Sequence, residues 1–210
     1  MFYEKKIVVS ILFVCGIFLL MHYLIDLFYY TDDVIISSFY GKYSDSKIAT
    51  LIEFRSDWYW LSYLAFPIIF LLDILIVSSV LYTGFYLSRI DIKFLSIFNI
   101  TLISQLVFIV PEVIKFFWFI FNPVSFENLR NFQPLSLFIL FDAESLQEWL
   151  FYPFKVLNVF EVVYWILLAF LLAKYLKSSI DAMLKIVLGY YVSFLFCWVV
   201  FVMFISLGNS

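Results

Sequence analysis

Six ionisable side chains lie inside long apolar stretches of this sequence, where their neighbours along the chain are mostly apolar. They are His22, Asp26, Asp73, Glu112, Lys115 and Glu161. An ionisable group inside a membrane costs free energy unless a second group answers it, so each one marks a structural contact or a working site. Carboxylates together with a histidine can relay protons, because histidine changes its charge near neutral pH.

The spacing of these residues puts two pairs on the faces of single helices. His22 and Asp26 are four residues apart, and Glu112 and Lys115 are three apart. Residues at these separations are neighbours on a helix surface. We therefore expect His22 to contact Asp26, and Lys115 to pair with Glu112 or with Glu161 from another helix.

Two interpretations of the six residues stay open. In the first they form a structural polar network that fixes how the helices pack. In the second they form an ion, proton or ligand site. Asp73 lies near the middle of its apolar run, whereas the other five lie closer to one end of theirs, so a site built from them should open to that side.

Two prolines, Pro67 and Pro111, also lie inside the apolar runs. Proline has no backbone N–H and its ring crowds the preceding turn, so it kinks a helix. We predict a kink at each position, and the second one lies directly beside Glu112.

Five apolar runs are long enough to cross a bilayer, for which about 20 residues suffice. They are Ile7–Tyr30, Trp58–Leu87, Phe94–Phe121, Phe154–Leu176 and Met183–Leu207. Apolar residues make up 65% of the 210 residues, above the share of about half that is usual in soluble domains. No repeat or linker divides the chain. We predict an all-α, polytopic membrane helix bundle, with residues 1–210 as one domain.

The basic residues predict how the bundle is oriented. If the N-terminus lies inside, the inner side holds seven of them, and the outer loops hold Lys42, Lys47, Arg55 and Arg130. Because inner loops carry the excess of Lys and Arg, the N-terminus is predicted inside and the C-terminus outside. Aromatic residues near the outer ends, Tyr59 among them, are expected to form a belt at the membrane surface.

The two outer loops are predicted to contain short interfacial helices. Ser46–Arg55 has apolar residues three and four apart, which indicates a helix lying on the membrane or on the protein. In the second loop, Asp142 could cap a helix whose apolar edge includes Leu146 and Trp149, leading through Pro153 into the fourth span.

Several functions are disfavoured by what the sequence lacks. His22 is its one histidine, so a His-rich metal site cannot be built, and no nucleophile elbow, phosphate-binding glycine loop or Cys-x-x-Cys occurs. A net charge of -3 without a basic patch argues against nucleic-acid binding. Five glycines against 28 phenylalanines predict bulky aromatic helix contacts and disfavour the unwound helices of secondary transporters. We expect no enzymatic activity, no cofactor and no metal.

Two segments near the end of the chain have a recognisable order of residues. They are Pro134-Leu-Ser-Leu-Phe-Ile-Leu and, after an acidic stretch, Leu157-Asn-Val-Phe-Glu-Val-Val-Tyr-Trp165-Ile-Leu-Leu-Ala. With the five-span plan, they resemble the Yip family, the Ypt/Rab-interacting group of membrane proteins that has many bacterial members. The chain departs from the eukaryotic relatives, because only Met1–Lys6 precedes the first span. The resemblance implies a bacterial-type integral membrane protein without assigned chemistry.

We therefore expect a non-enzymatic scaffold or accessory subunit of a larger membrane complex, in a bacterial inner membrane. Its partners would be the lipid bilayer and other membrane proteins or a second copy of the chain, with no nucleic acid. The alternative is a small proton- or ion-coupled carrier or channel that uses the intramembrane carboxylates. An intramembrane lipid-modifying enzyme is disfavoured, since no nucleophile and base can be nominated.

Overall fold

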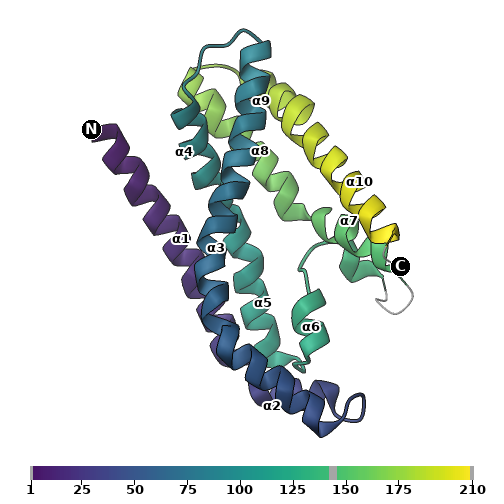
Figure 1. The fold of residues 1–210 in the computed structure, drawn as a ribbon. Helices are drawn as coiled ribbons and strands as arrows, with labels where there is room; N and C mark the ends of the chain where they lie inside the picture. The colour runs from purple at the N-terminus through teal and green to yellow at the C-terminus, as the bar shows by residue number, and fades with distance from the viewer. Residues whose placement is uncertain (1, 142–145, 209–210) are drawn as a thin grey trace.

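The computed structural model of the protein describes residues 2–141 and 146–208, with side chains from residue 7 onward. The described chain is helical, without a β-strand. Figure 1 shows long helices side by side, with the N-terminus toward the end near α4 and the C-terminus toward the end near α7. The elements are α1 (Phe2–Tyr29), α2 (Asp32–Phe39), α3 (Asp45–Leu87), α4 (Phe94–Ser104), η1 (Gln105–Phe108), α5 (Ile109–Phe121), α6 (Phe126–Asn131), η2 (Leu137–Leu140), η3 (Glu148–Leu150), α7 (Phe151–Val156), α8 (Val159–Leu176), α9 (Ile180–Ile186), η4 (Val187–Val192) and α10 (Ser193–Leu207).

Within the described residues, five helical stretches are long and apolar enough to cross a membrane. They are Ile7–Tyr29, Asp45–Leu87, Phe94–Phe121, Val159–Leu176 and Ile180–Leu207. The all-helical prediction is therefore confirmed for the described residues, and five helical stretches have the length and composition that the five predicted spans require. The boundaries of the second, fourth and fifth spans differ from those predicted.

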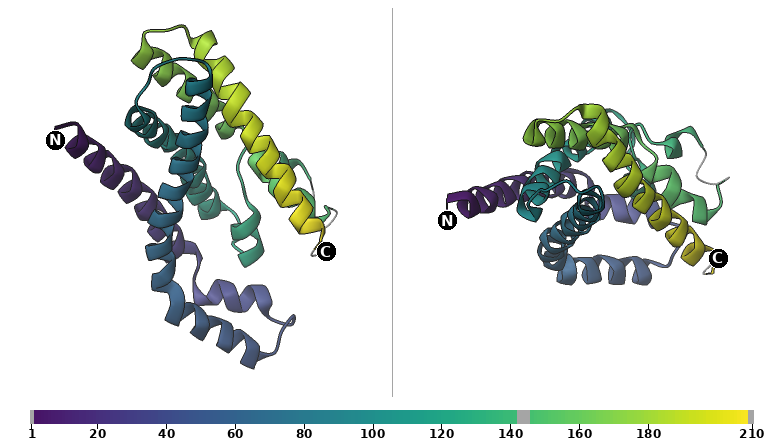
Figure 2. Two further views of the ribbon diagram at one scale, coloured as in Figure 1. Left: turned by 45° about the horizontal axis from the view of Figure 1, so that its top comes forward. Right: turned by 90° about the horizontal axis from the view of Figure 1, so that it is seen from above.

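The second span belongs to a helix that is much longer than predicted. α3 is 43 residues long and begins at Asp45, so the separate loop helix expected over Ser46–Arg55 is instead its first turns. No glycine or proline lies between residues 45 and 58 to end a helix there. At about 1.5 Å per residue α3 extends about 65 Å, twice the ~30 Å hydrocarbon thickness. Its first turns, which Figure 2 shows at an angle to the rest, can therefore reach beyond the hydrocarbon.

The two prolines affect their helices differently. The third span is interrupted by the 3-10 turn η1, which ends three residues before Pro111. The ring of Pro111 would crowd the carbonyl of Val107, four residues earlier and inside η1, so an irregular turn forms there as predicted. α3 runs through Pro67 without such a break. The helix is bent in Figure 2 but continuous, and Pro67 removes one backbone donor from it.

The fourth span begins at Val159, five residues later than predicted, because Asn158 starts a new helix. The Asn158 side chain accepts a hydrogen bond from the backbone N–H of Glu161 at 2.8 Å, an N-cap that satisfies a free donor of the first turn. The preceding helix α7 ends at Val156. Asp142, the expected cap of the second loop helix, lies outside the described residues, and what is described there is the short turn η3 followed by α7.

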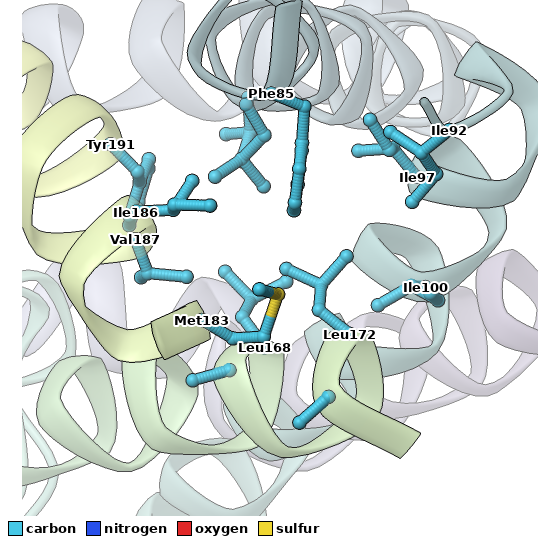
Figure 3. Close-up of a cluster of buried hydrophobic side chains, with 14 of the residues drawn as sticks. Phe85, Ile92, Ile97, Ile100, Leu168, Leu172, Met183, Ile186, Val187 and Tyr191 are labelled. Carbon is cyan, nitrogen blue, oxygen red and sulfur yellow. The ribbon is translucent and has the colours of Figure 1, made fainter. Parts of the chain in front are cut away.

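A buried apolar cluster holds α3, α4, α8 and α9 together (Figure 3). Phe85 of α3 points into it opposite Leu168 and Leu172 of α8, and Met183 of α9 fills the space beside them. In a bilayer such contacts stabilise the bundle chiefly through close packing, since lipid tails are as apolar as leucine.

One helix contact is closer than the predicted aromatic packing allows. A Cβ placed on Gly84 would lie 2.6 Å from Cδ2 of Tyr190, so α3 meets the π-helical turn η4 at a glycine. Elsewhere the prediction of aromatic contacts holds: α1 meets α5 through Tyr29, whose hydroxyl donates to the Phe116 carbonyl at 2.6 Å. Both modes of packing occur in one bundle.

Candidate functional site

A cavity of about 580 Å³ lies between α1, α3, η1 and α5. Four of the six predicted ionisable residues line it: His22, Asp26, Glu112 and Lys115. Six aromatic rings, the amide of Gln105, Ile25 and Ser62 complete the lining. The rings belong to Phe18, Tyr30, Tyr59, Phe66, Phe70 and Phe108. The structure thus brings polar groups of three spans together in a largely aromatic chamber.

Asp26 is the centre of the hydrogen bonding in this cavity. Its Oδ2 lies 3.3 Å from Nε2 of His22, which confirms the predicted contact. The same oxygen accepts hydrogen bonds from the hydroxyls of Tyr59 at 2.9 Å and Tyr63 at 3.1 Å. Asp26 is 8% exposed, and several partners are what a buried carboxylate requires.

The two tyrosines reach Asp26 because they are four residues apart on α3, so that their side chains emerge on one face. Their hydroxyls also lie 2.8 Å from each other. Tyr59 was expected in an aromatic belt at the membrane surface; in the structure its hydroxyl donates to the Asp26 carboxylate. The spacing of Tyr59 and Tyr63 was the signal that could have found them.

Asp73 connects to the cavity through an amide that the sequence analysis did not select. Nε2 of Gln105 donates to Oδ2 of Asp73 at 3.0 Å, and Gln105 itself lines the cavity. Gln105 opens η1, the irregular turn before Pro111. A buried amide in the third span therefore donates to the carboxylate of the second span, which takes part in none of the ion pairs of the described residues.

Lys115 does not form the predicted ion pair. Among the described side chains no carboxylate oxygen lies within 4.0 Å of its Nζ, although Glu112 lines the same cavity. Glu161, the other expected partner, is engaged elsewhere: its Oε1 accepts hydrogen bonds from Trp165 and Tyr191. The ammonium group of Lys115 therefore contributes a positive charge to the cavity without a direct carboxylate contact.

Glu161 belongs to a different part of the molecule. It lies in the first turn of α8 and lines an apolar groove beside Leu135–Leu140, away from the residues around Asp26. The six predicted residues thus divide into a cavity group and Glu161.

A second cavity of about 450 Å³ adjoins the first toward the loop between α1 and α2. Asp26, Tyr30 and Tyr59 line both cavities. Arg55 lines the second cavity and links α3 to the end of α1 and the start of α2. Its guanidinium group donates to the Tyr30 carbonyl, and its Nη1 lies 3.4 Å from Oδ1 of Asp32. Burial, reinforced by the negative charges of Asp26 and Glu112, raises the pKa of the Tyr30 hydroxyl. We call the smaller cavity, near this loop, the outer chamber and the larger one the inner chamber; Asp26 and Tyr59 lie where the two adjoin.

In the described residues, no three His, Cys, Asp or Glu side chains come together as ligands for a metal ion. No family model matches this chain, and no curated protein or solved structure matches it either. The geometry of the cavity is therefore what any assignment of function rests on.

Proposed function

We propose that this protein is a small integral membrane protein that admits a polar solute or ion to the cavity around Asp26 and exchanges protons there, as a coupled carrier or channel does. The observation that supports it is the convergence of His22, Asp26, Glu112 and Lys115 on one cavity of about 580 Å³. Ionisable residues inside spans that face a cavity mark ion and proton pathways.

The charges of the cavity favour coupling between a proton and a cation. Asp26 and Glu112 contribute two negative charges and Lys115 one positive charge, which leaves one negative charge when His22 is neutral. Protonation of His22 cancels that charge. A bound monovalent cation would do the same, so proton and cation would compete for the cavity.

The proposed path enters from the outer chamber. Asp26 and Tyr59 line both chambers, and their 2.9 Å hydrogen bond lies between them. The excess of Lys and Arg on the other side supports an orientation with the N-terminus inside, which turns the outer chamber away from the cytoplasm. A bacterial inner membrane fits this proposal.

Flux measurements in proteoliposomes test the proposal. A dye inside the vesicles reports proton movement when a pH gradient or a monovalent cation is applied. We expect the wild type to dissipate the gradient, and Asp26→Asn and Glu112→Gln to reduce the flux to the level of empty vesicles. The matched control is Asp33→Asn, an exposed acid of α2. Equal flux in the wild type and both cavity variants would contradict the proposal.

A second candidate is the scaffold or accessory subunit of a membrane complex. It is favoured by apolar side chains that are exposed outside the spans, Leu135, Leu140 and Phe141, of which Leu140 is 73% exposed. Contiguous exposed apolar residues often mark protein or membrane contacts. Purification in mild detergent distinguishes the candidates, since a scaffold should bring partner chains with it and a chain recovered alone as a monomer argues against this role.

The Yip-family assignment also remains a proposal. The two segments that carry the resemblance lie against each other, because the N–H of Leu137 donates to the Leu157 carbonyl at 2.9 Å and that of Val159 to the Leu135 carbonyl at 3.1 Å. The pairing supports treating the two segments as one structural unit. Replacement of either segment should then disturb the other.

A further inference from the structure

Glu161 is a carboxylate held at one oxygen only. Its Oε1 accepts hydrogen bonds from Nε1 of Trp165 and the hydroxyl of Tyr191, both at 2.8 Å. It is the third residue of α8 after the cap at Asn158, where the positive end of the helix dipole lies. Two donors and the N-terminus of a helix therefore surround Oε1 of this carboxyl group. Glu161 is 8% exposed, so the group is largely removed from water.

The other oxygen of Glu161 has no partner in the part of the chain that the structure describes. No hydrogen bond among the described residues reaches Oε2, and none of their ion pairs involves Glu161. An ionisable group at the edge of a membrane span is costly unless it has a partner. A donor from outside the described chain, above all a cationic one, would supply a partner for Oε2.

The space beside Glu161 is an apolar groove of about 450 Å³. Aliphatic side chains dominate its lining: Leu135, Leu137, Leu140, Val159, Val162 and Leu195. The backbone pairing of Leu135–Leu137 with Leu157–Val159 holds one wall against the start of α8. The groove therefore combines one acceptor for a cation with a surface for a hydrocarbon chain.

The position of the groove fits a lipid. Because the fourth span begins at Val159, Glu161 lies within the first turn of the span and not several turns inside it. Lipid headgroups lie at this level, with their acyl chains extending from it toward the membrane centre. A ligand that enters here from the bilayer can place a polar head at Glu161 and an acyl chain on the aliphatic wall.

We propose that the groove binds a membrane phospholipid whose headgroup ends in a primary ammonium, such as phosphatidylethanolamine. The ammonium donates to Oε2 of Glu161 in a charge-assisted hydrogen bond, and an acyl chain lies along Leu137, Leu140 and Val162. A trimethylated headgroup has no N–H to donate, and Trp165 is the one aromatic ring of the lining, too few for an aromatic cage. The proposal is independent of the function proposed for the cavity around Asp26.

Lipid retention tests it. The full chain is reconstituted in bilayers of equal phosphatidylethanolamine and phosphatidylcholine, extracted in mild detergent, and its retained lipid is measured by mass spectrometry. We expect the wild type to enrich phosphatidylethanolamine about tenfold over the bulk ratio, the factor typical of a hydrogen bond to a charged group. Glu161→Gln should return the ratio to that of the bulk.

A second variant keeps the test decisive if Glu161→Gln folds poorly. Val162→Trp fills the groove from an exposed position and leaves the carboxylate in place, so it should also abolish enrichment. Asp33→Asn, at an exposed acid of α2 that lines neither the groove nor the cavity around Asp26, is the control and should retain phosphatidylethanolamine as the wild type does. Equal retention of both lipids by the wild type, unchanged enrichment in the Val162→Trp variant, or a second protein chain recovered in place of lipid would overturn the proposal.

Discussion

Asp26 and Glu161 are both 8% exposed carboxylates of membrane spans, yet the protein surrounds them differently. Asp26 has two tyrosine hydroxyls and a histidine around a single oxygen, all supplied by α1 and α3. Glu161 has two donors at one oxygen and an apolar groove beside the other. In both residues the second oxygen accepts no hydrogen bond from the described residues. The comparison teaches that equally buried carboxylates can line a chamber shared with other ionisable groups or an apolar groove.

The largest effect is expected where the protein supplies the most partners. Asp26→Leu removes the shared acceptor of the half-buried Tyr59 and Tyr63 hydroxyls, which can then bond only to each other, and it removes the partner of His22. It should lower the free energy of unfolding by about 3 kcal/mol. The measurement is unfolding in mixed micelles, followed by tryptophan fluorescence. Asp33→Leu, on an exposed face of α2, is the control and should change it by less than about 0.5 kcal/mol. A loss for Asp26→Leu as small as that of the control would mean that this network contributes nothing to stability.

A smaller loss is expected at Glu161, because fewer donors lose their acceptor. Glu161→Leu should lower the free energy of unfolding by about 2 kcal/mol. Tyr191→Phe in the same background removes one stranded donor, so the double variant should recover part of the loss. The double-mutant cycle should give a coupling of about 1 kcal/mol between the two residues. Additive losses would show that the Tyr191 hydroxyl does not depend on Glu161.

Lys115 sharpens the comparison with a change of opposite sign. Since no carboxylate lies within 4.0 Å of its Nζ among the described residues, its ammonium loses solvation without a close ion pair in return. Lys115→Met should raise the free energy of unfolding by about 1 kcal/mol, measured in the same mixed micelles. In the proteoliposome assay the same variant should alter the selectivity of flux, because the net charge of the cavity becomes more negative. A destabilised Lys115→Met protein would reveal a partner that supports the ammonium.

Some of these features could be predicted from the sequence because they depend on neighbours along a helix. The contact of His22 with Asp26 follows from a separation of four residues, and the break before Pro111 follows from the missing N–H. The partners of Asp73 and Glu161 could not be predicted, since Gln105 and Tyr191 come from other helices whose rotation is set by packing. The five spans follow from apolar length alone. The ends of the spans do not follow from it. Asn158 begins a new helix inside an apolar run, and no glycine or proline separates the polar residues from Asp45 onward from the apolar part of α3.

The smallest effect concerns the wall of the Glu161 groove. Leu135 has a φ of +57°, a left-handed conformation that costs a residue with a side chain about 1 kcal/mol. It is kept there while its carbonyl accepts from the N–H of Val159 at 3.1 Å. Leu135→Gly should relieve this cost. Glycine also increases the entropy of the unfolded chain, which offsets part of the gain, so the free energy of unfolding should rise by about 0.5 kcal/mol.

Lys177 offers a matched control, because it has a φ of +53° at the end of α8 and lies outside the groove. Lys177→Gly should stabilise the protein by a similar amount, since glycine is the preferred residue after a helix end. Both variants are measured by unfolding in mixed micelles and by lipid retention. If the groove holds an acyl chain, Leu135→Gly should also weaken lipid retention, whereas Lys177→Gly should leave it unchanged. Equal lipid retention in the two variants would show that the Leu135 side chain does not contribute to lipid binding, and it would not bear on the role of Glu161.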